Sequence, residues 1–178
     1  PAVIFFARPA VRSLQPNSEP YTAEAAISES ILKLKRAPIG PAAAYNAQIT
    51  NVQIVDFDED GKSDVLVCDS LRSQVLLYRQ KSGGGWEELV LGSDLIAPAH
   101  ATVVDLDGDG QRDVVVSVLG SIFPSNEHVG RVVWLKRTAN GFEPKVLLDD
   151  VQRVADVQAG DLDDDGDQDL AVAVFGYS

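Results

Sequence analysis

Three stretches of the chain repeat an acidic pattern whose side chains could bind a metal ion. The middle copy, residues 105–113, reads DLDGDGQRD, and related copies occupy residues 56–64 and 161–169. Each copy follows Asp-x-Asp-x-Asp-Gly-x-x-Asp with an apolar residue in second place. Carboxylates crowded on alternate residues repel one another unless a cation lies between them. Ca²⁺ takes about six to eight oxygen ligands, and glycine at position six allows the loop to turn sharply around the ion.

Each loop predicts one set of calcium ligands, and the chain therefore predicts up to three Ca²⁺ ions. We expect the carboxylates at positions one, three, five and nine to bind, together with the backbone carbonyl of position seven. The expected residues are Asp56, Asp58, Asp60, Lys62 and Asp64 in the first loop, Asp105, Asp107, Asp109, Gln111 and Asp113 in the second, and Asp161, Asp163, Asp165, Asp167 and Asp169 in the third. The alternative interpretation is a solvated acidic turn. The loops are not EF-hands, because position twelve is valine in all three rather than glutamate.

Apolar segments before and after each acidic loop are typical of β-strands. Residues 65–67 and 114–116 are rich in β-branched side chains and are short, so they predict buried strands, and each acidic loop would join the two strands of a hairpin. Two complete units of four strands follow. In the first unit we place strands at residues 51–56, 64–69, 74–80 and 86–92, and in the second at 100–105, 113–118, 131–137 and 142–149.

The spacing of the units indicates a repeat. The loops start 49 and then 56 residues apart, and the second unit has a longer connection at residues 119–130. Tyr78 precedes Trp86 by 8 residues, as Trp134 precedes Phe142, and we take these pairs as equivalent. We divide the chain into an irregular lead-in at 1–49 with a possible outer strand at 29–36, units at 50–98 and 99–154, and an incomplete unit at 155–178.

These repeats resemble the FG-GAP/VCBS-type calcium-binding repeats, whose blades also occur in the head of the integrin α chain. The resemblance covers residues 50–178 and depends on the Asp-x-Asp-x-Asp-Gly-x-x-Asp loops between strands. It implies an all-β fold, namely part of a β-propeller built from four-stranded antiparallel blades, with calcium in the loop between the first and second strands of each blade. Propellers of this kind usually have more blades, so we expect further blades from the same chain or from a partner subunit.

Composition limits the possible partners. The net charge is −12, and 15 of the 27 acidic residues lie in the three loops, which argues against a nucleic-acid partner. The apolar segment at residues 1–7 is too short to span a bilayer, so we expect no transmembrane segment. Cys68 is the single cysteine, and it aligns with Ser117 and Ala173 as a small residue in the packing of the strands.

The sequence favours a binding module over an enzyme. It contains two histidines and no recognisable nucleophile–base pattern. We expect an extracellular adhesion or protein-interaction module, with a protein or carbohydrate ligand on the face opposite the calcium loops. Weak calcium sites would fill outside the cytoplasm, so we expect a secreted, periplasmic or cell-surface protein. The alternative is the propeller portion of a polysaccharide-active, lyase-like enzyme or of a redox enzyme.

The residue five places before each acidic loop is polar. His100, Asn51 and Asp156 hold this position, and in a propeller they would converge near the axis, where they would line a polar channel or bind a ligand. His128 lies in the longer connection and is expected to be a solvated loop residue.

Overall fold

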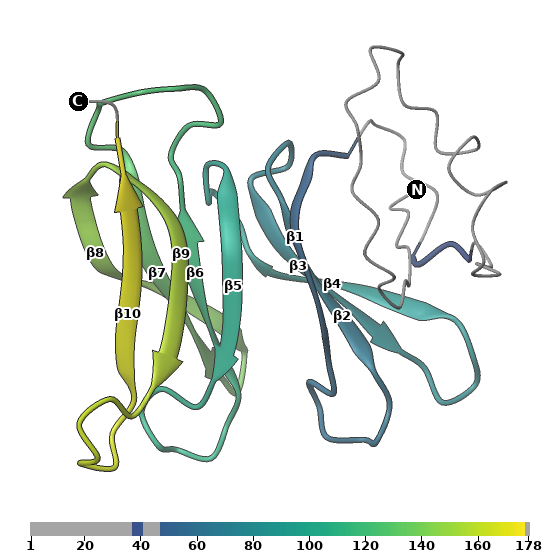
Figure 1. The fold of residues 1–178 in the computed structure, drawn as a ribbon. Coiled ribbons are helices and arrows are strands. Elements are labelled where there is room, and N and C mark those ends of the chain that lie inside the picture. Colours follow the sequence, from purple (N-terminus) through teal and green to yellow (C-terminus); the bar gives the residue numbers. More distant parts are fainter. Residues whose placement is uncertain (1–36, 41–46, 177–178) are drawn as a thin grey trace, which may run out of the picture.

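The computed structural model describes residues 37–40 and 47–176, and this part of the chain contains β-strands but no helix (Figure 1). The expected strand at 29–36 lies outside it. The strands form two four-stranded sheets and one two-stranded sheet, all antiparallel. In chain order they are β1 (Ile49–Val55), β2 (Asp64–Asp69), β3 (Gln74–Gln80), β4 (Trp86–Gly92), β5 (Pro98–Val104), β6 (Asp113–Val118), β7 (Gly130–Thr138), β8 (Gly141–Val151), β9 (Arg153–Gly160) and β10 (Asp169–Phe175).

Each sheet is a meander of strands that follow one another in the sequence. The orders are β1-β2-β3-β4, β5-β6-β7-β8 and β10-β9, so the predicted four-stranded antiparallel units are confirmed. The central strands β2 and β6 are buried along their whole length, as their β-branched runs predict. Pro144 lies in β8, which is an outer strand of its sheet and pairs with β7 alone, the position in which a missing backbone donor is tolerated. The sheets lie side by side and do not close into a ring (Figure 1).

One predicted equivalence between the units is wrong by one residue. Val65 pairs with Tyr78 in the first sheet, and the corresponding residue Val114 pairs with Leu135 rather than with Trp134. The longer connection in the second unit therefore adds one more residue than the tryptophan spacing indicates, and the β7–β8 hairpin is correspondingly shorter. Because strand side chains alternate, this single-residue shift turns Trp134 to the opposite face of its sheet from the side of Tyr78.

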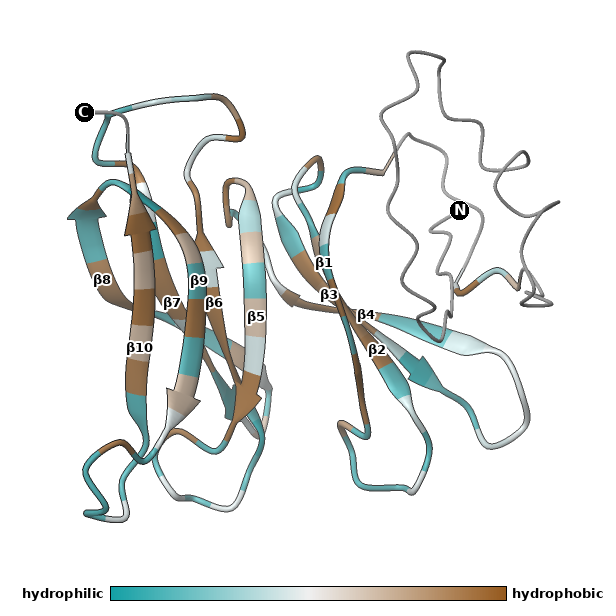
Figure 2. Cartoon of the chain, viewed as in Figure 1, coloured by the Kyte–Doolittle hydropathy of each residue, from teal (hydrophilic) through white to brown (hydrophobic). Residues whose placement is uncertain are grey.

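Two of the three apolar clusters in the described residues lie between neighbouring sheets. Leu66 and Cys68 of β2 pack with Val114 and Val116 of β6 in one apolar cluster, and Val115 of β6 packs with residues of β9 and β10 in another. Each of these two strands thus places its two faces in two different apolar clusters. Figure 2 shows apolar residues along the strands and polar residues in the acidic loops. Burial raises the pKa of the Cys68 thiol to about 12, so this cysteine remains protonated and serves in packing.

The apolar residue in second place of each acidic loop reaches toward the next sheet. Phe57 is 3% exposed and lies 6.1 Å from Phe142 between ring centroids, and Leu106 packs with residues of the third sheet. The equivalent Leu162 is 70% exposed. The first two loops therefore have an apolar anchor as well as carboxylates, and the third does not pack its leucine against the described residues.

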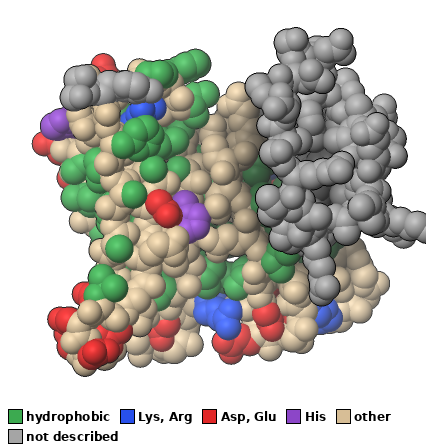
Figure 3. All heavy atoms as spheres, in the orientation of Figure 1, with side chains coloured by type: hydrophobic (Ala, Val, Ile, Leu, Met, Phe, Trp, Pro, Cys, Tyr) green, Lys and Arg blue, Asp and Glu red, His purple; other side chains and the backbone are tan. Residues whose placement is uncertain are grey.

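The connections divide between two ends of the sheets. The three acidic loops lie together at the lower edge of Figure 1, and the connection 119–129 lies at the upper edge. Acidic side chains gather along the same lower edge in the space-filling view (Figure 3). The described residues include no helix that is long and apolar enough to cross a membrane.

Candidate metal centres

Each acidic loop brings three carboxylates together. The groups are Asp56, Asp58 and Asp64 in the first loop, Asp105, Asp107 and Asp113 in the second, and Asp161, Asp163 and Asp169 in the third. Within each group one oxygen from every carboxylate lies within 4.8 Å of the others. Two oxygens bound to the same Ca²⁺ at about 2.3–2.6 Å can be at most about 5.2 Å apart. Positions one, three and nine are thus spaced for one shared cation.

The backbone of the loop holds the first aspartate in the same way three times. The amides of Gly61, Gly110 and Gly166 donate to Oδ2 of Asp56, Asp105 and Asp161 at 3.0, 2.8 and 2.9 Å. All three glycines have positive φ angles of 82°, 82° and 93°, which non-glycine residues rarely adopt. Glycine at position six is therefore required by the turn, as the pattern predicts.

Position four is also in the left-handed region, which the sequence analysis missed. Glu59, Gly108 and Asp164 have φ angles of 60°, 70° and 62°. Gly108 could have indicated the positive φ at this position, because glycine adopts this conformation without steric cost. Glu59 is the least favourable residue of the three there, and its side chain is held by a contact described below.

The last aspartate of the loop fastens it to the sheet. Asp64 is completely buried, and it accepts hydrogen bonds from the amides of Phe57 at 3.1 Å and Gln80 at 2.8 Å. Asp113 repeats both contacts, with the amides of Leu106 and Arg137. One carboxylate thus joins the loop, the second strand and the third strand of each four-stranded sheet.

The first loop contains an oxygen that fits a cation. Oδ1 of Asp56 is buried and accepts no hydrogen bond in the described part of the chain. A buried carboxylate oxygen without a donor is unfavourable unless a cation is nearby. Together with the oxygen spacing, this unsatisfied atom makes the donor set suitable for a hard cation such as Ca²⁺.

The expected ligands at positions five and seven are arranged differently. Oδ1 of Asp60, Asp109 and Asp165 accepts the amide of position seven, namely Lys62, Gln111 and Asp167, each at 2.9 Å. None of these six residues belongs to the three-carboxylate groups. Their assignment as ligands stays a prediction.

Basic side chains contact the carboxylates of the first two loops. Lys136 of β7 contacts Asp107 and lies 3.1 Å from Asp109, while its counterpart on β3, Arg79, lies 3.6 Å from Asp58. The hydrogen bond to Asp107 raises the pKa of Lys136, and the Gln111 amide and Lys136 lower that of Asp109. Lys62 likewise lowers the pKa of Asp60. The third loop contains no lysine or arginine.

We expect Lys136→Met to strengthen calcium binding at the second loop a few-fold. The ammonium group competes with a cation for two carboxylates. Methionine removes this charge and also the contact of Lys136 Nζ with the Trp134 ring, 5.2 Å from its centroid, but it keeps an apolar stem of similar length. An NMR calcium titration that follows the signal of the Gly110 amide measures the affinity of the second loop. The Gly166 amide of the third loop is the internal control. Unchanged or weaker binding at Gly110 would show that Lys136 does not compete with the ion.

The predicted convergence of polar residues on the innermost strands is correct for two of three residues. His100 Nδ1 lies 2.7 Å from Asp156 Oδ1. The first sheet contributes Gln53, whose Nε2 lies 2.8 Å from His100 Nε2 and donates to the Ala101 carbonyl at 2.5 Å. Asn51, which was expected here, is not part of this contact, and its Oδ1 is buried without a partner among the described residues.

The pair of contacts selects one form of the imidazole. Because the Gln53 amide nitrogen can only donate, Nε2 of His100 must accept, and Nδ1 then carries the proton toward Asp156. Both ring nitrogens are thereby occupied. The three residues form a polar bridge across β1, β5 and β9, which supports the polar-lining interpretation. His128, 3.4 Å from Asp150, is exposed as expected.

Comparison with known proteins bears on the repeats. A search of curated proteins finds no match to the chain. The family model described as FG-GAP-like repeat matches residues 38–116, which contain the first acidic loop and the second. Residues 38–116 are therefore an FG-GAP-like repeat region, which confirms the resemblance predicted from the acidic loops.

Proposed function

We propose that the chain is part of a calcium-stabilised β-propeller that acts as a protein-interaction or adhesion module. The observation that carries the proposal is the threefold recurrence of one loop geometry, with three carboxylates grouped between the first two strands of each sheet. The FG-GAP-like repeat supports it, because repeats of this type fit propeller blades and suggest protein interaction.

In this proposal the aspartates at positions one, three and nine hold Ca²⁺ in each loop, and position five and the carbonyl of position seven complete the set. The ion would neutralise the crowded carboxylates and keep the two ends of the loop together. Its role is structural. In the first two loops the surrounding residues fix the loop through the closing aspartate and the apolar residue in second place.

We place the partner on the end of the sheets opposite the acidic loops. The connection 119–129 exposes Ile122 and Phe123, with 46% and 71% of their surface accessible. The buried Arg153 of β9 donates to the Phe123 carbonyl at 3.1 Å and so ties this connection to the framework. A loop that presents an aromatic side chain from a fixed scaffold is suited to protein or carbohydrate recognition.

We also propose that the protein works outside the cytoplasm, at the cell surface, in the periplasm or in the surrounding medium. Calcium modules of extracellular type bind with Kd of about 10⁻⁴–10⁻³ M. Such sites need millimolar calcium to fill. The proposal rests on this affinity range, and cell fractionation tests it.

A binding experiment with matched variants tests the function. The 178-residue chain is immobilised and offered a fixed panel of purified matrix proteins and polysaccharides, in calcium and in EGTA. Phe123→Ser should abolish calcium-dependent binding, while Leu162→Ser should not, because the two residues lie at opposite ends of the sheets. Leu162 is a matched control, since the two side chains are almost equally exposed, at 71% and 70%.

Two results would contradict the proposal. Binding that survives Phe123→Ser and is lost in Leu162→Ser would move the partner to the acidic loops. Depolymerisation of a polysaccharide, or its redox conversion, would favour the alternative that these sheets belong to an enzyme.

A further inference from the structure

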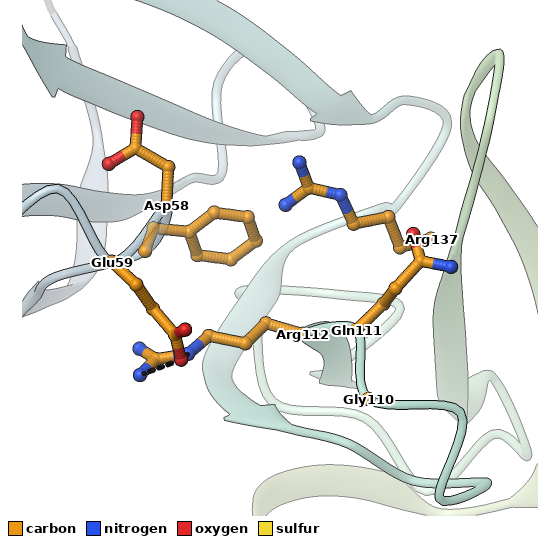
Figure 4. A pocket seen from close by; sticks show the side chains of 7 residues that line it. Asp58, Glu59, Gly110, Gln111, Arg112 and Arg137 are labelled. Atoms are coloured by element: carbon orange, nitrogen blue, oxygen red, sulfur yellow. Dashed lines mark hydrogen bonds and ion pairs between the residues drawn. The ribbon is translucent and has the colours of Figure 1, made fainter.

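The first and second acidic loops are joined by a single side chain. Arg112 is the eighth residue of the second loop, between Gln111 and the buried Asp113. Its Nη1 donates to the backbone carbonyl of Asp56, the first residue of the neighbouring loop. Its Nε and Nη2 lie 3.1 and 2.9 Å from Glu59 Oε1. Figure 4 shows the Arg112 guanidinium meeting Glu59. Both residues line a cleft of about 170 Å³ between the loops.

The two groups that Arg112 holds matter to the shape of the first loop. Asp56 supplies a carboxylate to the first metal-binding group and carries the buried oxygen without a donor. Glu59 occupies the left-handed position with φ of 60°, where its conformation is unfavourable without an external contact. Arg112 thus fixes both the first residue and the turn of the neighbouring loop.

The contact is specific to this pair of loops. Position eight is Ser63 in the first loop and Gln168 in the third, and neither has the charged fork of a guanidinium group. The second loop can therefore act on the first in a way that the third cannot act on the second. The third loop, with Gln168 at position eight, is therefore an internal control for the Arg112 contact.

We propose that Arg112 couples cation binding at the two loops, so that filling the second loop raises the affinity of the first. The inference rests on the proposed calcium sites. A cation on the Asp113 group orders the segment that carries Arg112, and Arg112 then holds Asp56 and Glu59. A loop that is already ordered loses less conformational freedom when it binds its own ion. Linkage requires the reverse effect to be equal.

The expected coupling is about fivefold in affinity. Coupling between sites ranges from about 5-fold to 150-fold, and the lower end is appropriate because the Arg112 side chain is 35% exposed and that of Glu59 is 71% exposed. Direct repulsion between the two ions acts in the opposite direction. At about 0.15 M salt it is screened over roughly 8 Å, so the titration is best performed there.

Three glycine amides report the loops separately. Gly61, Gly110 and Gly166 each donate to the first aspartate of their own loop, so an NMR calcium titration of the ¹⁵N-labelled 178-residue chain gives one binding curve for each site. In Arg112→Gln, which places the residue of the third loop in the second, the Gly61 curve should shift to about fivefold higher calcium. The Gly166 curve should not move.

A double-mutant cycle separates coupling from a local effect on the first loop. Asp107→Asn, which weakens the second site, should weaken binding at Gly61 about fivefold in the wild-type background and hardly at all in Arg112→Gln. Asp163→Asn in the third loop should leave the Gly61 curve unchanged in both backgrounds. Arg112→Lys keeps the charge but not the fork, and it should behave like Arg112→Gln.

The outcomes distinguish this inference from the proposed function. Three saturating curves, with Gly61 indifferent to both Arg112→Gln and Asp107→Asn, would overturn the coupling and leave the calcium sites intact. An absence of calcium response at all three glycines would overturn the sites themselves, and the coupling with them. If Arg112→Gln weakens calcium binding at Gly61 equally with and without Asp107→Asn, the two sites are not coupled. Arg112 would then only stabilise the first loop locally.

Discussion

Removal of calcium is expected to lower the melting temperature of the chain by roughly 5–11 °C for each site that was filled. An ion that binds only the folded state stabilises it by about 2.7 kcal/mol when its concentration is about a hundred times Kd. For a chain of this size, 1 kcal/mol corresponds to about 2–4 °C. The physical source of the effect is the crowding of three carboxylates within 4.8 Å in each loop, which is unfavourable without a cation.

Thermal unfolding in 10 mM Ca²⁺, in EGTA and in EGTA with Mg²⁺ measures this effect. Magnesium is the matched control, because it has the same charge but prefers a smaller octahedral shell and gives up its water reluctantly. It should restore less of the stability than calcium. A melting temperature that is the same in calcium and in EGTA would show that the loops are solvated acidic turns.

Asp64→Ala is expected to be the most damaging single change in the loops, with a loss of about 3–5 kcal/mol even in EGTA. The carboxylate is fully buried and accepts two backbone amides, from Phe57 and Gln80. Hydrogen bonds to a charged group contribute about 1.5–3 kcal/mol each, and alanine would leave both donors buried without a partner. Phe57 would also lose the anchor that holds it in the core between the sheets.

The third loop provides the comparison for this variant. Asp169 is only partly buried, and it accepts the amide of Leu162 at 2.9 Å, so Asp169→Ala should cost about half as much as Asp64→Ala. Asp64→Asn should fall between them, since it retains an acceptor oxygen but also brings a donor. Urea unfolding in EGTA gives the three values. Equal losses at Asp64 and Asp169 would show that burial of the closing carboxylate is not the cause.

The strands are predictable from the sequence because particular residue types mark where each one begins and ends. The strand bounds of β2, β3, β4 and β6 agree with those predicted, and the other predicted bounds in the four-stranded sheets differ by at most two residues. Glycines lie at the turns between the third and fourth strands, and an aspartate follows each innermost strand. β-Branched residues indicate the buried second strands. These signals act within a few residues, so local sequence patterns are sufficient to predict the strands.

The contacts between sheets could not be predicted in the same way. Arg112 and Glu59 are 53 residues apart in the sequence, and Gln53 meets His100 although the repeat pattern indicates Asn51. Such pairs depend on how one sheet is rotated against the next. The error at Trp134 has a different origin, namely the register within one sheet, because aromatic spacing alone does not determine which face of a strand a residue occupies.

The connectivity of the sheets also determines how the chain can fold. Among the described residues, every pairing of strands joins two that are consecutive in the sequence. The innermost hairpin of the first sheet closes between Val55 and Asp64, around the acidic loop. Short loops close quickly, and proteins dominated by such local contacts fold faster than those with distant pairings. We expect the hairpins of each sheet to form first, and the apolar faces of β2 and β6 to be buried when neighbouring sheets pack together. We expect the side-chain bridges through Arg112 and His100 to form after this packing, and their loss should then accelerate unfolding rather than slow folding.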